Sequence, residues 1–329
     1  MSVRELLFSC GLGAVLVASY GCDVVQGRTG VEGVFDRALV VSGAVDLNVR
    51  TGSGHVQIRT GPGDTVHVVG HVRANASWFG EPPESRIAEI QAHPPIEQDG
   101  NTIRIGETAD NALYRNLSIS YELTVPVDTS VRSHSGSGDQ AIGSVRGAVE
   151  ATSGSGAIHM AQIDGNVEAS TGSGRIELER ATGSFTAHTG SGSIRAGATE
   201  GAVQARTGSG QIDVTQTGEA DADLRTGSGS IAIVGARGLL QAHTGSGRIA
   251  ISGRPAHDWD LSAASGTITM NLAEDAAFDL GARSGSGAID TTLPVTVSGV
   301  VSRHQLQGTV RGGGASVHAT TGSGSIRIR

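Results

Sequence analysis

The chain has 329 residues and a formal net charge of −8, and arginine supplies all 24 of its lysine-plus-arginine residues. Glycine, with 50 residues, is about twice as frequent as the roughly 7% of an average protein, but it follows no Gly-X-Y period, which excludes collagen. The acidic balance and the lack of a basic cluster argue against nucleic acid as a partner.

Residues 1–21 have the pattern of an export signal, with Arg4 as the positive charge and an apolar segment from Leu6 to Ala18 that is short for a membrane span. The residues before Cys22 resemble a bacterial lipobox, although Ser19 stands where leucine is usual. We expect Cys22 to be lipidated, with plain secretion or an uncleaved anchor as alternatives. The protein is then extracytoplasmic and membrane-anchored, and residues 22–33 form a tether.

Residues 34–130 predict an N-terminal β portion. Alternating apolar residues predict strands around 45–49 and 117–127. The stretch from about 73 to 116 breaks this pattern and includes one or two helical turns between Glu84 and Ala92. We interpret it as an irregular insertion, or as a sheet that caps the repeats that follow.

A Thr-Gly-Ser-Gly tetrapeptide recurs at steps of 18 or 19 residues from Ser135 to Ala263, which indicates stacked structural units. Residues on either side alternate between apolar and polar, as in strands, and the glycines are expected to adopt positive φ and turn the chain sharply. Full or near copies begin at Thr51, Ser135, Ser153, Thr171, Thr189, Thr207, Thr226, Thr244, Ser284 and Thr321, and a degenerate copy begins at Ala263.

One unit buries too few side chains to offset the entropy of ordering about 18 residues, so the units must stack. The pattern predicts an all-β, single-stranded β-solenoid over residues 131–329, right-handed by the general preference of parallel crossovers. The inward Thr and Ser of each tetrapeptide are expected to bond to one another or to the turn backbone. The 37-residue gap from Ser284 to Thr321 predicts a degenerate rung around 303–307, and the last strand, with Arg327 and Arg329, is expected at an edge.

The alternation before Pro126, the repeated Gly-Ser-Gly-x-Ile, the glycines at 312–314 and the terminal segment 321–326 resemble the bacterial DUF4097/DUF2807-like families of β-strand repeats. These families are also described as adhesin or autotransporter-adhesin head domains. The resemblance covers most of residues 35–329 and implies an extracytoplasmic β-solenoid. It supplies no catalytic residue.

Outward residues just before the tetrapeptides form a column that includes four consecutive cationic or titratable side chains about 4.8 Å apart. We name these four the pre-corner strip: His188, Arg206, Arg225 and His243. One interpretation is charge compensation by the neighbouring outward column of Gln204, Asp223 and Gln241. The other is a binding site for an acidic glycan or a lipid head group.

Other chemistry has weaker support in the sequence. Asp221 and Asp223 share a face, and acids also cluster at 257–260, but neither group has the spacing of a glycosidase or lyase site. His67 and His71 share a strand face but form a weak metal pair, and the varied residues after Gly-Ser-Gly argue against repeated calcium sites. We predict no catalytic residue, metal or cofactor.

Two tryptophans remain as contact candidates in this aromatic-poor chain. Trp78 and Trp259 are expected in loops, where they either stack on sugar rings or close the end of the core. The sequence therefore predicts a non-enzymatic binding or adhesion module of the bacterial envelope, with an extended glycan or another envelope component as partner. The alternatives are a carbohydrate-active enzyme on a β-helix and an envelope structural or stress-sensing protein.

Overall fold

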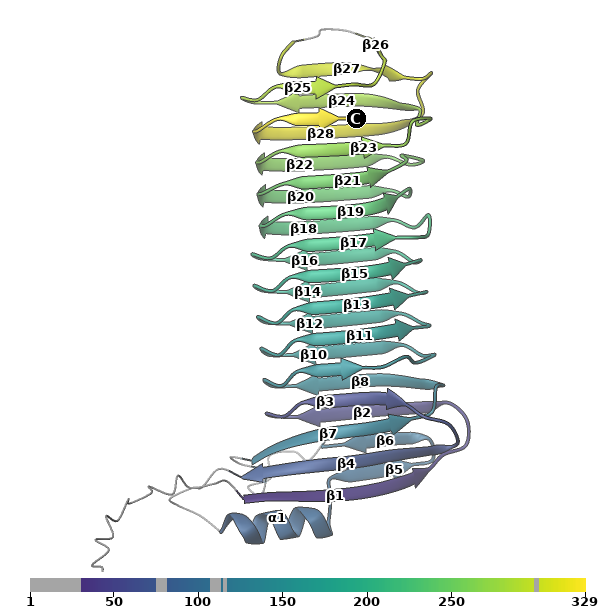
Figure 1. Ribbon diagram of the computed structural model, residues 1–329, viewed down its shortest axis with the longest axis vertical. Helices are drawn as coiled ribbons and strands as arrows, with labels where there is room; N and C mark the ends of the chain where they lie inside the picture. Colours follow the sequence, from purple (N-terminus) through teal and green to yellow (C-terminus); the bar gives the residue numbers. More distant parts are fainter. Residues whose placement is uncertain (1–30, 75–81, 107–113, 115–116, 299–301) are drawn as a thin grey trace, which may run out of the picture.

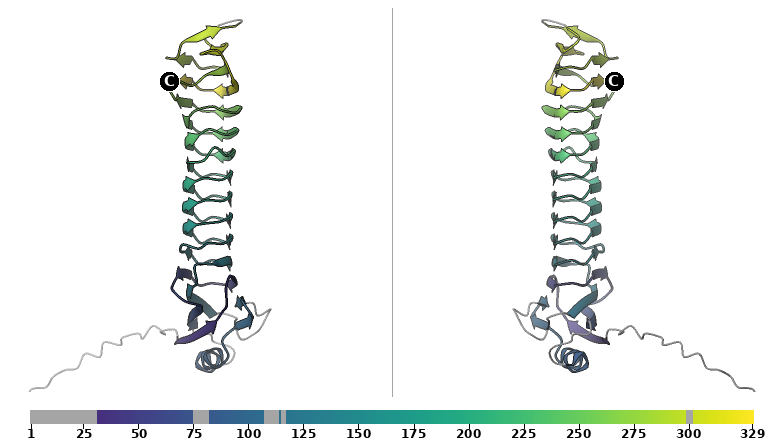
Figure 2. Two further views of the ribbon diagram at one scale, coloured as in Figure 1. Left: turned by 90° about the vertical axis from the view of Figure 1, so that its right-hand side faces the viewer. Right: turned by 90° about the vertical axis from the view of Figure 1, so that its left-hand side faces the viewer.

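The structure, a computed structural model, describes residues 31–74, 82–106, 114, 117–298 and 302–329. It is a long column of stacked strands whose two walls are β-sheets, with a helix at the N-terminal end (Figures 1 and 2). The expected β-solenoid is confirmed. The described part of the chain contains no helix that is both long enough and apolar enough to cross a membrane.

One wall is a fourteen-stranded sheet, which we call sheet A. In spatial order its strands are β1 (Val31–Val40), β4 (Thr65–Ala74), β7 (Leu117–Val125), β3 (Val56–Thr60), β9 (Gln140–Ile142), β11 (Ile158–Ile163), β13 (Ile176–Ala181), β15 (Ile194–Thr199), β17 (Ile212–Gln216), β19 (Ile231–Ala236), β21 (Ile249–Gly253), β23 (Ile268–Leu272), β29 (Ile326–Ile328) and β25 (Ile289–Thr291).

The opposite wall is a fifteen-stranded sheet, which we call sheet B. In spatial order its strands are β26 (Val295–Val297), β27 (Gln305–Val310), β24 (Phe278–Ser284), β28 (Ala315–Ser323), β22 (Trp259–Ser265), β20 (Leu240–Ser246), β18 (Ala222–Ser228), β16 (Val203–Thr207), β14 (Phe185–Thr189), β12 (Val167–Thr171), β10 (Val149–Ser153), β8 (Thr129–Ser135), β2 (Val45–Thr51), β6 (Thr102–Ile105) and β5 (Ile96–Asp99).

Each regular rung consists of one strand of sheet B, a corner of Thr/Ser-Gly-Ser-Gly or a close variant, and one strand of sheet A. In the rung formed by β16 and β17, alternate residues are buried within each strand, from Val203 to Thr207 and from Ile212 to Val214, and the corner between them is not buried. Equivalent residues of successive rungs pair in register, so Ile194, Ile212 and Ile231 form one apolar column. The interior is thus continuous along the solenoid, and each rung completes the core of its neighbours.

The inward hydroxyls bond to the corner backbone, one of the two expected arrangements. All of them except Thr51 donate a hydrogen bond to a glycine carbonyl of the adjacent rung, and many also accept one from a glycine N–H of their own corner. Thr51 instead donates to the carbonyl of Ile119 at 2.7 Å. The inter-rung bonds include Thr171 to Gly156 (3.0 Å), Thr189 to Gly174 (3.1 Å), Thr207 to Gly192 (2.9 Å), Thr226 to Gly210 (3.0 Å) and Thr321 to Gly266 (2.9 Å). The degenerate corner has Ala263 at this position and lacks the hydroxyl.

The expected reason for the corner glycines was wrong for most of them. Among the corners that the structure describes, only Gly247, Gly266 and Gly324 have positive φ, at 152° to 157°. The general reason is close approach: a Cβ on Gly210 would lie 1.7 Å from the carbonyl oxygen of Gly192. Glycine at this position lets one backbone stack directly on the next.

At the N-terminal end, spatial order differs from chain order. The rung of β2 and β3 stacks on β8 and β9, and also pairs on its other side with β6 and β7, which follow it in the sequence. The stretch expected to be an irregular insertion therefore supplies β6, one strand of a further rung, and the strand expected at 117–127 supplies the other, β7. Beyond that rung the pairing is antiparallel: in sheet A, β4 pairs with β7 and β1 pairs with β4, and in sheet B, β5 pairs with β6. The helix α1 (Pro83–Ala92) lies at the place of the expected helical turns and packs against β1.

The C-terminal end shows the same exchange of order, and two expectations about it were wrong. The gap after Ser284 contains no degenerate parallel rung in its described residues; β27 instead pairs antiparallel with β24. The last rung, β28 and β29, is not at an edge, because it lies between β22 and β23 on one side and β24 and β25 on the other (Figure 1). Parallel pairing is possible on both sides of any rung, so a sequence period does not specify this order.

Candidate ligand-binding surface

The four residues of the pre-corner strip lie side by side on the outer face of sheet B. His188 pairs in register with Arg206, Arg206 with Arg225, and Arg225 with His243. Three of the four side chains are exposed, and His243 is half-buried. Strand pairing therefore places four side chains from four successive rungs in one line.

Asp223 lies between the two arginines of the strip. Its Oδ2 accepts a hydrogen bond from Arg206 Nη2 at 3.1 Å, and its Oδ1 accepts one from Arg225 Nε at 2.7 Å. Partial burial alone would raise the pKa of Asp223, but the hydrogen bonds and charges of Arg206 and Arg225 outweigh it and hold the pKa below its usual value. One carboxylate thus compensates part of the charge of two arginines, and Arg225 also donates to Gln241 Oε1 at 3.2 Å.

The column is longer in the structure than the sequence analysis indicated. Arg50 and His134, which precede the corners at Thr51 and Ser135, hold the same position in their rungs as Arg206 holds in its own. This position in the motif was the available signal, and it was missed. In spatial order the column is Arg50, His134, Thr152, Ser170, His188, Arg206, Arg225, His243, Ser262, Thr320 and Arg283.

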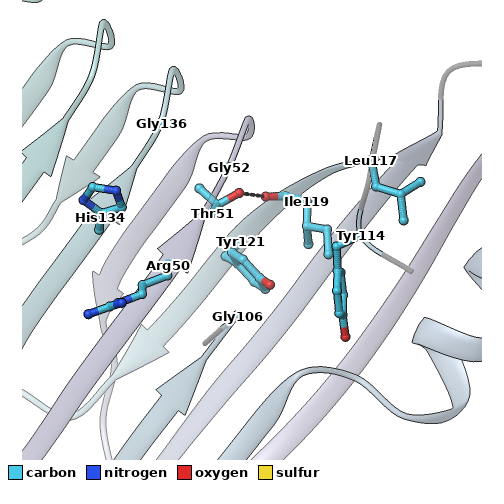
Figure 3. Close-up of a pocket in the computed structure, with 10 residues that line it drawn as sticks. All are labelled: Arg50, Thr51, Gly52, Gly106, Tyr114, Leu117, Ile119, Tyr121, His134 and Gly136. Carbon is cyan, nitrogen blue, oxygen red and sulfur yellow. Dashed lines mark hydrogen bonds between the residues drawn. The ribbon is translucent and has the colours of Figure 1, made fainter. Parts of the chain in front are cut away.

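A pocket of about 310 Å³ opens at the N-terminal end of this column (Figure 3). Arg50 and His134 line it together with residues of β7 and of the segment before β7. Its lining residues are Arg50, Thr51, Gly52, Gly106, Tyr114, Leu117, Ile119, Tyr121, His134 and Gly136. The pocket therefore combines cationic or titratable groups with two aromatic rings and two aliphatic side chains.

Tyr121 is the most deeply buried side chain with a hydroxyl in this pocket, and the residue is only 1% exposed. Burial, with a smaller effect from Tyr114, raises the pKa of the Tyr121 phenol well above its usual value, so this group remains protonated. A Cβ on Gly106 would lie 2.0 Å from the Arg50 carbonyl oxygen and 3.2 Å from the Tyr121 hydroxyl, which shows how closely these groups approach.

The outer face of sheet A carries a different arrangement of charge. His159 lies 3.7 Å from Glu177 and 3.4 Å from Glu179, and Arg195 lies 3.9 Å from Asp213. Opposite charges in adjacent rungs support the register, and such exposed pairs contribute little stability individually.

Two of the acidic candidates for catalysis are engaged with the backbone. Asp221 accepts a hydrogen bond from the Leu239 N–H at 3.0 Å, and Asp258 accepts one from the Ser316 N–H at 2.8 Å. The weak metal pair, His67 and His71, gains no third ligand in the structure. His71 lies 3.5 Å from Glu122, and the described residues contain no group of three or more potential metal ligands.

The remaining candidates fall inside the core or outside the described residues. Trp259 begins β22 rather than lying in a loop, is fully buried, and donates a hydrogen bond to the Gly238 carbonyl at 3.1 Å. It therefore closes the core and cannot stack on a sugar ring at the surface. Trp78 and Cys22 lie outside the residues that the structure describes.

Two facing parallel sheets joined by glycine-rich corners, with a ligand-sized pocket at one end, define an all-β solenoid with an exposed polar column. Residues 167–329 match the model of the Toastrack DUF4097 family. The expected resemblance is thereby confirmed, and no curated protein matches the chain in sequence.

Solved structures with detectable similarity are distant. A "putative adhesin" from Bacteroides fragilis is 13% identical with a TM-score of 0.40, and the match covers 90% of this chain and 97% of that one. A "putative cell adhesion protein" from Clostridium sporogenes is 12% identical with a TM-score of 0.19, over 90% of this chain and 99% of that one.

Proposed function

We propose that the protein is a non-enzymatic binding module of the adhesion type that holds an extended anionic glycan along the pre-corner strip. We also propose that Cys22 is lipidated and anchors the module in the bacterial envelope. The observation that carries the binding proposal is the pairing of Arg206 and Arg225 around the single carboxylate of Asp223.

The charge of the strip favours an anionic ligand. Two arginines against one carboxylate leave one uncompensated positive charge, and His188 and His243 extend the line at both ends. Arginine suits carboxylate and sulfate groups because its planar donors can form paired hydrogen bonds with them.

The regular spacing favours a polymer over a compact ligand. Neighbouring members of the strip belong to successive rungs and are about 4.8 Å apart, so a chain with a repeating acidic unit can meet several of them in turn. The engagement of Asp221 and Asp258 with backbone N–H groups supports binding over glycoside hydrolysis, which needs two carboxyl groups free to act on substrate.

The binding proposal is tested with the double variant Arg206→Ala, Arg225→Ala against polygalacturonate and neutral dextran immobilised on a sensor. We expect the parent to bind polygalacturonate and not dextran, and the double variant to lose at least tenfold in affinity. The matched control is Arg175→Ala, Arg195→Ala, which removes the same charge from sheet A. Equal binding by the parent and both double variants would reject the strip as the site.

The anchor proposal is tested by metabolic labelling with palmitate in a bacterial host. We expect label on the parent and none on Cys22→Ser. Unchanged labelling of the variant would reject lipidation at Cys22.

A further inference from the structure

We propose that His188 and His243 are the outer binding sites of the pre-corner strip and gain charge in mildly acidic medium. An oligouronate is then held across four rungs in acidic medium and across two in alkaline medium. This inference rests on the proposed function and adds to it the length of the ligand and the dependence of binding on pH.

The first observation is the order of the side chains. Strand pairing places the two arginines in the middle of the strip and one histidine at each end. The four strands concerned, β14, β16, β18 and β20, are consecutive in sheet B (Figure 1). Beyond the histidines the column continues with uncharged side chains, Ser170 on one side and Ser262 on the other. The strip is therefore a segment of four rungs, about 14 Å from end to end at the usual inter-strand spacing.

The second observation is that only the two ends of the strip change charge near neutral pH. The arginines stay protonated, and Asp223 stays ionised because its pKa lies below the usual value. Histidine is the side chain that ordinarily changes charge between about pH 5 and pH 8. The two arginines and Asp223 together have one net positive charge, and protonation of both histidines raises the charge of the strip to three.

The third observation is the surroundings of each histidine on the outer face of sheet B, which are one arginine, uncharged side chains and one or two diagonal carboxylates. Around His188 on β14 they are Arg206 and Gln204 of β16, Ser170 and Glu168 of β12, and Thr186 of the same strand. Around His243 on β20 they are Arg225 and Asp223 of β18, Ser262 and Asp260 of β22, and Gln241 of the same strand. Among the described residues, the ion pairs of this face include neither histidine. Both imidazoles can therefore meet a ligand without first leaving a carboxylate.

A glycan with an acid on every residue matches this arrangement. One pyranose residue lengthens a glycan by about one inter-strand spacing, so four consecutive uronates can face four rungs. The inner two meet arginine at any pH, and the outer two meet a positive charge only when His188 and His243 are protonated. A bound polyanion favours the protonated imidazoles, so binding and proton uptake should be coupled.

The test measures the affinity for digalacturonate and tetragalacturonate at about pH 5.5 and about pH 8, at constant ionic strength. Uronate carboxylates, like other carboxyl groups that ionise near about pH 4, are charged at both values. We expect the parent to bind the tetramer roughly fivefold to tenfold more tightly at the lower pH, with a smaller change for the dimer. The variant His188→Gln, His243→Gln should bind the tetramer at both pH values as the parent does at the higher one.

The matched control is His71→Gln, His159→Gln, which removes two histidines from the outer face of sheet A. It should keep the pH dependence of the parent. A pH dependence that survives in the variant without His188 and His243 would overturn the inference, as would loss of the dependence in the control.

Proton uptake provides a second readout that a merely structural role of the histidines would not produce. Calorimetric titration with tetragalacturonate near about pH 6.5, in two buffers of different ionisation enthalpy, gives the number of protons taken up on binding. We expect uptake by the parent and none by His188→Gln, His243→Gln. Equal heats in the two buffers for the parent would overturn the inference.

The failure of this inference can be distinguished from the failure of the proposed function. Polygalacturonate binding that is lost in Arg206→Ala, Arg225→Ala but is equal at both pH values would overturn the role of the histidines and leave the strip. Binding that depends on pH through His188 and His243 but is insensitive to the two arginines would overturn the arginine pair as the centre of the site. Parent protein that binds no polygalacturonate at either pH would overturn both.

Discussion

The hydroxyl of Thr207 donates a hydrogen bond to the carbonyl oxygen of Gly192 in the adjacent rung, at 2.9 Å. The same hydroxyl accepts a hydrogen bond from the Gly210 N–H of its own corner, at 3.1 Å. One small buried side chain thus connects two corners, and its equivalents repeat this contact along the solenoid.

Replacing this hydroxyl by a methyl group should weaken the solenoid. We expect Thr207→Val to lower the free energy of unfolding by about 1–3 kcal/mol, because the shape is kept while a buried donor and a buried acceptor lose their partner. Urea unfolding followed by circular dichroism measures the change. The control is Thr186→Val on the outer face of sheet B, which should stay within about 0.5 kcal/mol of the parent; equal losses in the two variants would contradict the role of the corner hydroxyl.

Replacement by alanine should destabilise the protein more at Gly210, the second glycine of its corner, than at Gly52, the first glycine of the corner at Thr51. A Cβ on Gly210 would meet the Gly192 carbonyl oxygen at 1.7 Å, whereas a Cβ on Gly52 meets nothing within 4 Å. Gly210→Ala should therefore cost more than about 2 kcal/mol by forcing adjacent rungs apart, and Gly52→Ala should be nearly neutral. Melting temperatures of the two variants check this, and similar values would show that close stacking does not explain the glycines.

Two serines on the inner face of β8 should respond in opposite directions. Ser133 Oγ is buried without a partner among the described residues, and the next rung has Ala151 at this position. Ser133→Ala should raise the free energy of unfolding by about 1 kcal/mol, since it removes an unsatisfied buried hydroxyl. Ser135→Ala should lower it, because Ser135 Oγ accepts a bond from the Gly138 N–H at 2.8 Å; chemical denaturation that shows the same sign for both would refute this distinction.

The regular part of the fold was predictable because the period and the alternation agree. The 18- or 19-residue steps place Val203, Ile212 and Val214 in the core, and strand pairing then places Arg206 beside Arg225. The sequence does not specify which rung lies beside which at the ends, because every rung offers the same parallel edges. The position of β28 between β22 and β24 therefore could not be predicted from the period.

The candidate site was likewise predictable only where it follows the repeat. The strip follows from residues that share a place in the motif, and Arg50 and His134 could have been included by the same rule. The pocket could not be derived this way, because Gly106, Tyr114 and Tyr121 come from a stretch without the period and meet Arg50 only through the exchanged rung order. Trp259 was expected in a loop because the insertion before it hides its alternation with Leu261.

The contribution of Asp223 to stability should depend on pH. Its pKa in the folded protein lies below the ordinary value of 3.8, so the ionised form stabilises the fold fully above that value. The contribution is lost as the pH falls from there through the lowered pKa. We expect the difference in unfolding free energy between the parent and Asp223→Asn to be largest near about pH 6 and to shrink toward about pH 3; a difference that is constant over this range would contradict ion pairing by Asp223.

The most direct test of the proposed strip is the affinity of Asp223→Asn for polygalacturonate. This substitution keeps the shape of the side chain and removes the one carboxylate that Arg206 and Arg225 share. If these arginines bind an anionic polymer, releasing them from Asp223 should tighten binding several-fold at low salt, with the gain decreasing as salt is added. Unchanged or weaker binding by Asp223→Asn would contradict the account.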